Sequence, residues 1–100
     1  MSEVIETNSS GGKNSLIKRR FDLIPASVLL ILAEVFYEGS IKYTPDNWKK
    51  VPAEDHLNHM LNHIFNYKIE TKNRTEHIAH ALCRCFMWVY MEIMRDKTSV

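Results

Sequence analysis

Residues 77–94 read HIAHALCRCFMWVYMEIM, and the fold that we expect follows from this stretch. Its apolar residues recur at helical spacing, which predicts a helix that begins after Asn73 and extends to about Asp96. From Ala81 to Met94 the pattern is apolar nearly all round, so we expect this helix to be buried on more than one side. A domain of this size cannot surround such a helix, and we therefore expect a homo-oligomer.

Two shorter helical patterns precede this stretch. The first is expected to begin near Pro25 and to end after Glu38 at Gly39, because a first turn tolerates proline and glycine favours a C-terminal cap. The second is expected to begin near Pro52 and to reach about Lys68, with acidic residues in the first turn, where the helix dipole favours anions. The patterns predict an all-α fold of three main helices in a small bundle that oligomerisation completes.

Size and charge limit the classes of function. One hundred residues allow one domain, and we expect a flexible N-terminal tail at residues 1–16 and a single helical domain at residues 17–97. The formal charge of +1, from 13 basic and 12 acidic residues, gives no reason to expect a nucleic-acid partner. The apolar run at residues 28–35 is far shorter than the ~20 residues that cross a bilayer, so no membrane partner is expected.

The two cysteines, Cys83 and Cys85, lie in the last helical pattern. Side chains two positions apart on a helix point in different directions, so an intrachain disulfide between these two is implausible. Reduced, packed thiols are typical of a reducing compartment. The first twelve residues are polar and do not resemble a signal peptide. We therefore expect a cytoplasmic protein.

Two carboxylates, Glu34 and Glu38, lie one helical turn apart in the first helix. Such a pair repels itself on an isolated helix, whereas a divalent cation that prefers oxygen ligands, such as Mg²⁺, reverses the repulsion. Glu34 is in line with the apolar residues Leu30 and Ile31, which predicts that it faces inward. The alternative for Glu38, which lies near the helix end, is a solvated surface position.

Imidazole and guanidinium groups gather in the other two helices. His59 and His63 share a face of the second helix, whereas His56, in its first turn, is expected to be exposed. The third helix carries another set on one face: His77, His80 and Arg84. Two imidazoles and a guanidinium in a row would bind phosphate oxygens. The alternative is that they form the wet stripe of an otherwise buried helix.

The segment after the first helix has side chains that suit a nucleotide. They are Lys42, Tyr43, Asn47 and Trp48. A lysine can hold a phosphate, an aromatic ring can stack on a base, and an amide can read the edge of that base. The alternative is an ordinary loop that Trp48 anchors on the core.

Several motifs occur in the order that one known family shows. They are Arg20–Pro25 (RFDLIP), Leu32–Val35 (LAEV), Gly39–Tyr43 (GSIKY), Asn47-Trp48, His63 and His77–Ala81 (HIAHA). Over about residues 19–94 the chain resembles the phage-encoded family of dATP/dGTP diphosphohydrolase N-terminal domains and, by looser analogy, the all-α nucleotide pyrophosphohydrolases of MazG type. The resemblance implies an all-α domain that acts on purine deoxynucleoside triphosphates with a divalent metal, Mg²⁺ or Mn²⁺.

This resemblance implies a role for each candidate residue. The metal ligands would be Glu34, Glu38 and Glu70. Catalytic roles, including proton transfer near neutral pH, would fall to Glu34, His63, His77 and His80. Phosphate charge would be neutralised by Lys42 and Arg84, and the base would be held by Tyr43, Asn47 and Trp48. The bound metal would lower the pKa of a water that attacks phosphorus.

The chain also departs from the family pattern. Asn62 stands where the family has an arginine, Arg84 stands where it has an asparagine, and the acidic loop is shortened to residues 69–73. The lost acids and the gained Arg84 favour a second interpretation, in which a non-catalytic binder sequesters a nucleotide or a nucleotide-derived signal. A third is a structural protein whose apolar last helix is an assembly surface. The sequence does not decide between an enzyme and a binder.

Overall fold

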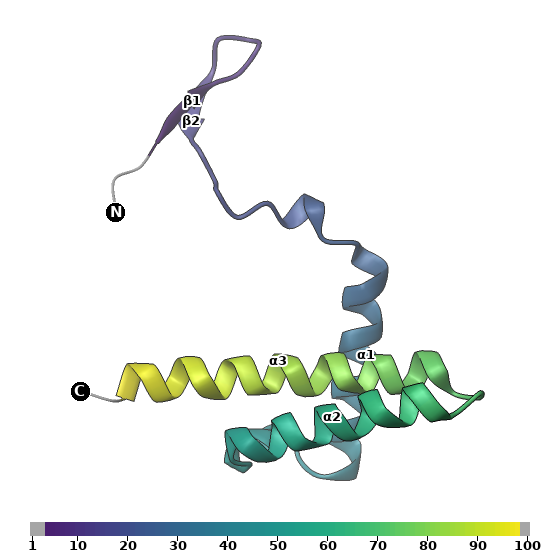
Figure 1. The fold of residues 1–100 in the computed structure, drawn as a ribbon. Coiled ribbons are helices and arrows are strands. Elements are labelled where there is room, and N and C mark those ends of the chain that lie inside the picture. Colours follow the sequence, from purple (N-terminus) through teal and green to yellow (C-terminus); the bar gives the residue numbers. More distant parts are fainter. Residues whose placement is uncertain (1–3, 99–100) are drawn as a thin grey trace.

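The computed structural model describes residues 4–98 and has three α-helices (Figure 1). They are α1 (Ala26–Lys42), α2 (Ala53–Ile69) and α3 (Arg74–Thr98). Helices α2 and α3 run antiparallel and pack side by side, and α1 crosses them (Figure 1). The expected all-α fold is confirmed, and the observed bounds of α2 and α3 agree with the predicted ones to within about two residues.

Helix α1 continues beyond its predicted end. The prediction that Gly39 caps it is wrong, because the helix extends to Lys42 and the Tyr43 N–H bonds the Gly39 carbonyl at 3.0 Å. A glycine cap works by adopting a positive φ, and among the described glycines only Gly11 does so. The extra turn carries Lys42, and a four-residue segment then connects α1 to the short 3₁₀ helix η2 (Asn47–Lys50).

A two-stranded hairpin precedes the helices. Strands β1 (Ile5–Thr7) and β2 (Lys13–Ser15) pair antiparallel, and the Asn8 side-chain oxygen accepts hydrogen bonds from turn N–H groups. The hairpin and the 3₁₀ helix η1 (Phe21–Leu23) extend away from the helices (Figure 1). This hairpin lies where a flexible tail is predicted, and residues 1–3 of that tail lie outside the described residues.

The hydrophobic core is small. Its buried apolar residues are Leu32, Ala79, Ala81 and Cys83. The radius of gyration is 18.3 Å, whereas a compact domain of 100 residues has about 13 Å. This large value reflects the N-terminal hairpin and η1, which extend away from the helices. The single chain leaves Ile78, Phe86 and Val89 of α3 about half exposed, so the expected burial of this helix on several sides would need a partner copy. Within residues 4–98, no helix combines the length and the hydropathy that crossing a bilayer requires.

One side of α3 carries large apolar residues at helical spacing, each 36–51% exposed. We call this set the α3 apolar face; it consists of Ile78, Leu82, Phe86, Val89 and Ile93. Phe86, in the middle of this face, also packs edge-on against Phe36 of α1, with ring centroids 5.5 Å apart.

Candidate functional site

A cavity of about 770 Å³ lies where α1 and η2 meet α2 and α3. Eight of the eleven predicted site residues line it: Glu38, Lys42, Tyr43, Asn47, Trp48, His63, His80 and Arg84. They come from different helices and from the segment between α1 and α2. The crossing of the helices therefore brings together side chains that are up to about 45 positions apart in the sequence.

Three predicted residues, Glu34, Glu70 and His77, do not line this cavity. The prediction that Glu34 faces inward is wrong, because Glu34 is exposed on α1. Its alignment with Leu30 gives no evidence of burial, since Leu30 is itself 66% exposed. Glu70 follows the end of α2 and His77 lies in the first turn of α3. These two contact each other directly beside the cavity, and His77 in turn contacts His63, which lines it.

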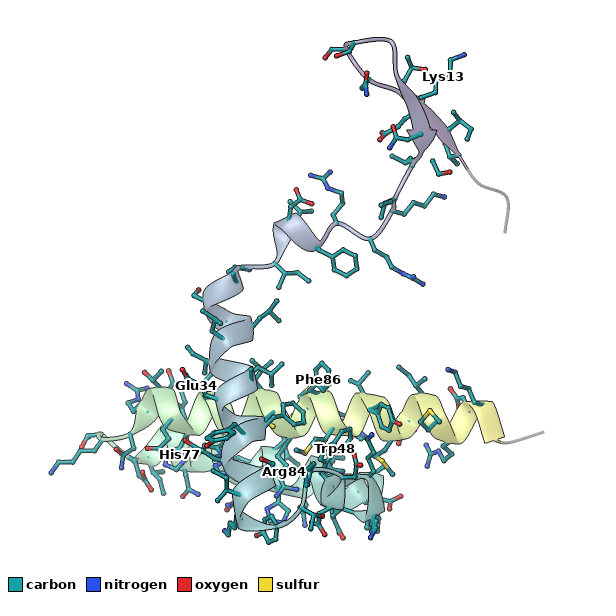
Figure 2. All side chains as sticks on the ribbon, turned by 180° about the vertical axis from the view of Figure 1, so that it is seen from behind. Lys13, Glu34, Trp48, His77, Arg84 and Phe86 are labelled. Atoms are coloured by element: carbon teal, nitrogen blue, oxygen red, sulfur yellow. The ribbon has the colours of Figure 1, made fainter. Side chains whose placement is uncertain are left out.

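His56 anchors the cationic side of the cavity. The prediction that it is exposed is wrong: its side chain is fully buried. One ring nitrogen, Nε2, lies 2.9 Å from the Trp48 carbonyl oxygen, and Nδ1 lies 3.1 Å from Nη1 of Arg84. Burial lowers the pKa of His56, and the charge of Arg84 lowers it further. In Figure 2, Trp48 and Arg84 lie near one another at the helix crossing.

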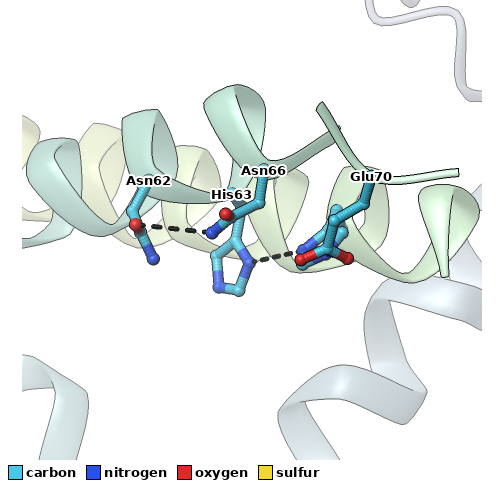
Figure 3. Close-up of polar contacts among 5 residues, drawn as sticks. Asn62, His63, Asn66 and Glu70 are labelled. Carbon is cyan, nitrogen blue, oxygen red and sulfur yellow. Dashed lines mark hydrogen bonds and ion pairs between the residues drawn. The ribbon is translucent and has the colours of Figure 1, made fainter. Parts of the chain in front are cut away.

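A second polar chain runs from Glu70 through His77 to His63. A Glu70 carboxylate oxygen lies 2.6 Å from Nε2 of His77, and the Nδ1 atoms of His77 and His63 are 3.3 Å apart. The His63 ring also stacks on the His80 ring at 5.2 Å between centroids. In Figure 3, the dashed line from the His63 ring ends beside Glu70, where His77 contacts the Glu70 carboxylate. These contacts connect the Glu70 carboxylate, which lies outside the cavity, to the imidazoles of His63 and His80, which line it.

Burial lowers the pKa of His63, and the neighbouring His80, His77 and Arg84 lower it further. His63 is therefore neutral near pH 7 and has one nitrogen that can accept a proton. While His77 is neutral and gives its Nε2 proton to Glu70, its Nδ1 accepts the proton on Nδ1 of His63. In this state Nε2 of His63 carries the free lone pair.

Trp48 forms the aromatic wall of the cavity. Its ring packs edge-on against Phe36 and Tyr90, with centroids 5.8 and 5.0 Å apart, and Lys49 lies over it at 5.6 Å. The two interpretations of this loop are therefore compatible, because Trp48 is anchored on the core and also lines the cavity. Lys42 lies over the ring of its neighbour Tyr43 at 5.2 Å from the centroid.

The cavity is lined by one carboxylate from each helix. They are Glu38 of α1, Asp55 of α2 and Glu76 of α3. Asp55 and Glu76 were not predicted to belong to a site, because acids in a first helical turn are explained by the helix dipole alone. Other lining residues that were not predicted are His59, which lies on the His63 face, and Asn62.

Glu34, Glu38 and Glu70 do not form a ready-made metal centre. Across residues 4–98, no three carboxylate, imidazole or thiol side chains lie close enough to hold one ion. Mg²⁺, however, keeps several waters and is commonly bound by one or two carboxylates together with the phosphates of the substrate. Of the three predicted metal ligands, Glu38 is the one that lines the cavity.

Comparison with known proteins identifies the family of the chain. No curated protein and no solved structure gave a match to the chain. The family model described as dATP/dGTP diphosphohydrolase, N-terminal, matches residues 8–99. This match covers nearly the whole chain and is the family that the motif order indicates. The chain therefore belongs to the family of dATP/dGTP diphosphohydrolase N-terminal domains.

Proposed function

We propose that the domain binds a purine deoxynucleoside triphosphate in the cavity and hydrolyses its phosphate chain. The observation that carries the proposal is the gathering of cationic, imidazole, aromatic and carboxylate groups around one cavity of about 770 Å³ in a chain of this family. Cavities that bind small molecules have volumes of roughly 300–1,000 Å³. The cavity is thus of a size that suits one nucleotide.

The phosphates would lie between α1 and α3. Lys42 and Arg84 are the cations that line the cavity, and His80 lies one helical turn before Arg84. A guanidinium binds two phosphate oxygens at once, whereas an ammonium acts as a point charge. Arg84 would orient the phosphate chain, and Lys42 would neutralise its charge.

The base would lie against the aromatic wall. Trp48 is held by Phe36 and Tyr90, so its ring is fixed before a ligand arrives. Tyr43 and Asn47 line the same part of the cavity and supply a second ring and an amide. A held ring costs less entropy on stacking than a mobile one, and an amide can distinguish hydrogen-bonding edges.

The hydrolytic step would use His63. Its Nε2 can accept a proton from the attacking water while Glu70 and His77 keep its Nδ1 proton in place. Glu38 would hold Mg²⁺ or Mn²⁺. Such an ion supplies charge neutralisation on the phosphates and lowers the pKa of a bound water.

The proposed activity has a direct test. Purified protein incubated with dGTP or dATP and Mg²⁺ should release pyrophosphate or phosphate, detected by ³¹P NMR. Arg84→Met and His63→Gln should each lower the rate by about a hundredfold. Arg19→Met, at an exposed position outside the cavity, serves as the matched control and should leave the rate unchanged. Intact triphosphate after prolonged incubation with either metal would refute hydrolysis.

A non-catalytic binder is the second candidate. The observation that favours it is the absence, within residues 4–98, of a three-ligand metal cluster. In that case dGTP or dATP would stabilise the protein against heat and be recovered unchanged after denaturation. Recovery of the hydrolysed nucleotide would exclude this candidate.

We also propose that the chain acts as a homo-oligomer in the cytoplasm, where deoxynucleoside triphosphates are found. The α3 apolar face supports association between copies. Exposed apolar patches of this kind mark interaction surfaces in soluble proteins. A monomer that has nucleotide-hydrolysing activity would refute the need for assembly. A structural role alone would be supported if no nucleotide binds.

A further inference from the structure

His56 is the one fully buried side chain within residues 4–98, at 0% exposure. A buried imidazole is costly unless both of its ring nitrogens have partners, and here both do. The partners belong to two different elements: the Trp48 carbonyl is in η2, and Arg84 is in α3. His56 itself lies in the first turn of α2. It therefore connects three separate parts of the cavity wall.

The two contacts specify a single protonation state. A carbonyl oxygen only accepts hydrogen bonds, so Nε2 of His56 must carry the proton that is donated to Trp48. A guanidinium only donates, so Nδ1 of His56 must be unprotonated to accept from Arg84. Only the neutral imidazole with its proton on Nε2 satisfies both contacts. A protonated ring would place an N–H against the N–H groups of Arg84.

The surroundings of His56 favour the neutral state. Burial lowers its pKa, and the charges of Arg84 and His59 act in the same direction. The Trp48 carbonyl and Asp55 act in the opposite direction and raise the pKa. Burial is the largest influence, so the net direction is downward. His56 therefore remains an acceptor for Arg84 at neutral pH.

Arg84 and Trp48 line the same cavity, where Arg84 would meet phosphate and Trp48 would meet the base. We propose that His56 is a positioning residue that aims the Arg84 guanidinium and fixes the η2 backbone, so that phosphate and base are held at a set separation. This inference rests on the proposed function. The contact to His56 involves one Nη1 hydrogen of Arg84, so other N–H groups of the fork are available to phosphate oxygens.

Two substitutions separate the two contacts of His56. In His56→Asn the side-chain oxygen can take the place of Nδ1, which keeps an acceptor for Arg84 but loses the donor to Trp48. In His56→Gln the longer amide can take the place of Nε2, which keeps the donor but loses the acceptor. Inorganic tripolyphosphate probes the phosphate end alone, and dGTP probes both ends. Isothermal titration without metal measures the affinity for each.

We expect His56→Gln to weaken the binding of tripolyphosphate and of dGTP by roughly tenfold or more, since it releases a charged partner. His56→Asn should keep tripolyphosphate binding within about threefold but weaken dGTP binding more strongly. In an Arg84→Met background, His56→Gln should cause no further loss of tripolyphosphate binding. Leu32→Ala removes a buried side chain that does not line the cavity, and it is the control for reduced stability.

A purely structural role predicts a different pattern. The losses would then add in the Arg84→Met background, and Leu32→Ala at equal stability would weaken tripolyphosphate binding as much as His56→Gln does. Either result would overturn the proposal, as would unchanged binding by His56→Gln.

Failure of the proposed function is recognised separately. A folded wild-type protein that binds neither tripolyphosphate nor dGTP would refute that function. Histidine ¹⁵N NMR then decides whether His56 contacts both Trp48 and Arg84. A neutral ring with its proton on Nε2, and a His56 pKa that rises in Arg84→Met, would support these two contacts. A His56 pKa that Arg84→Met leaves unchanged would refute them.

Discussion

Substitution of Val89 by glutamate should separate the chain into monomers. The chain exposes 8356 Å², whereas a compact monomer of 11.7 kDa exposes about 5,900 Å². The excess of about 2,500 Å² is roughly three times the area of about 800 Å² that each partner buries in a standard interface. The α3 apolar face accounts for part of this excess, and Val89, at 50% exposure, is one of its five residues.

The size of the effect follows from the charge that is introduced. A carboxylate that loses water in an interface without a partner costs about 3–5 kcal/mol. Each 1.4 kcal/mol changes a dissociation constant tenfold, so Val89→Glu should weaken self-association by about two to four powers of ten. Val89 does not line the cavity, and the helix content of the monomer should change little.

Sedimentation velocity over a range of protein concentrations provides the measurement. The wild type should sediment as a dimer or larger assembly at micromolar concentration, and Val89→Glu as a monomer. Asn58→Glu introduces the same charge at an exposed polar position of α2 and should leave the assembly intact. A wild-type monomer at about 200 µM, well above micromolar dissociation constants, would refute this reasoning, as would equal dissociation in both variants.

Three further outcomes are expected. Burial lowers the folded-state pKa of His56 and His63 below the ordinary value of 6.5, so the stability linked to them is complete above 6.5 and lost as the pH falls below it. The free energy of urea unfolding should fall between about pH 7 and pH 5, by up to about 1.4 kcal/mol per pH unit for each proton that the chain takes up on unfolding. His63→Gln should reduce this slope, and a pH-independent free energy of unfolding would contradict the prediction. Burial raises the pKa of Cys83 to about 11, so iodoacetamide should modify Cys85 in the native protein and Cys83 only after unfolding, as peptide mass spectrometry would show. Gly39→Ala should stabilise α1 by about 0.5–1 kcal/mol in urea titrations, since its added Cβ meets no atom within 4 Å, yet weaken dGTP binding because it lines the cavity; stronger binding would count against the assigned site.

The sequence predicts the helices well because their signals are local. The acids that follow Pro52 and the turn before Arg74 specify where α2 and α3 begin, and each signal acts within a few residues. The hairpin was not predicted, since its three-residue strands are too short for periodicity to show. Gly39 favours a cap by its residue type, yet a glycine is also compatible with a helix interior, where the structure places it.

The positions of single side chains depend on tertiary packing and were less predictable. The position of Glu34 one turn after Leu30 predicts an inward side chain, but no other described element covers that side of α1. His56 was expected in solvent because first turns are usually wet, but η2 folds over it and supplies the Trp48 carbonyl. Asp55 reaches the cavity only because α1 crosses α2 and α3, an arrangement that no local pattern contains.

The cavity is also the seam along which α1 and η2 rest on the other two helices. A chain with so few buried apolar residues gains little cohesion there from its own side chains. A nucleotide that contacts all three helices would hold them together and add its binding free energy to that of folding. Survival of the protein against cellular proteases would then rise and fall with the supply of that nucleotide.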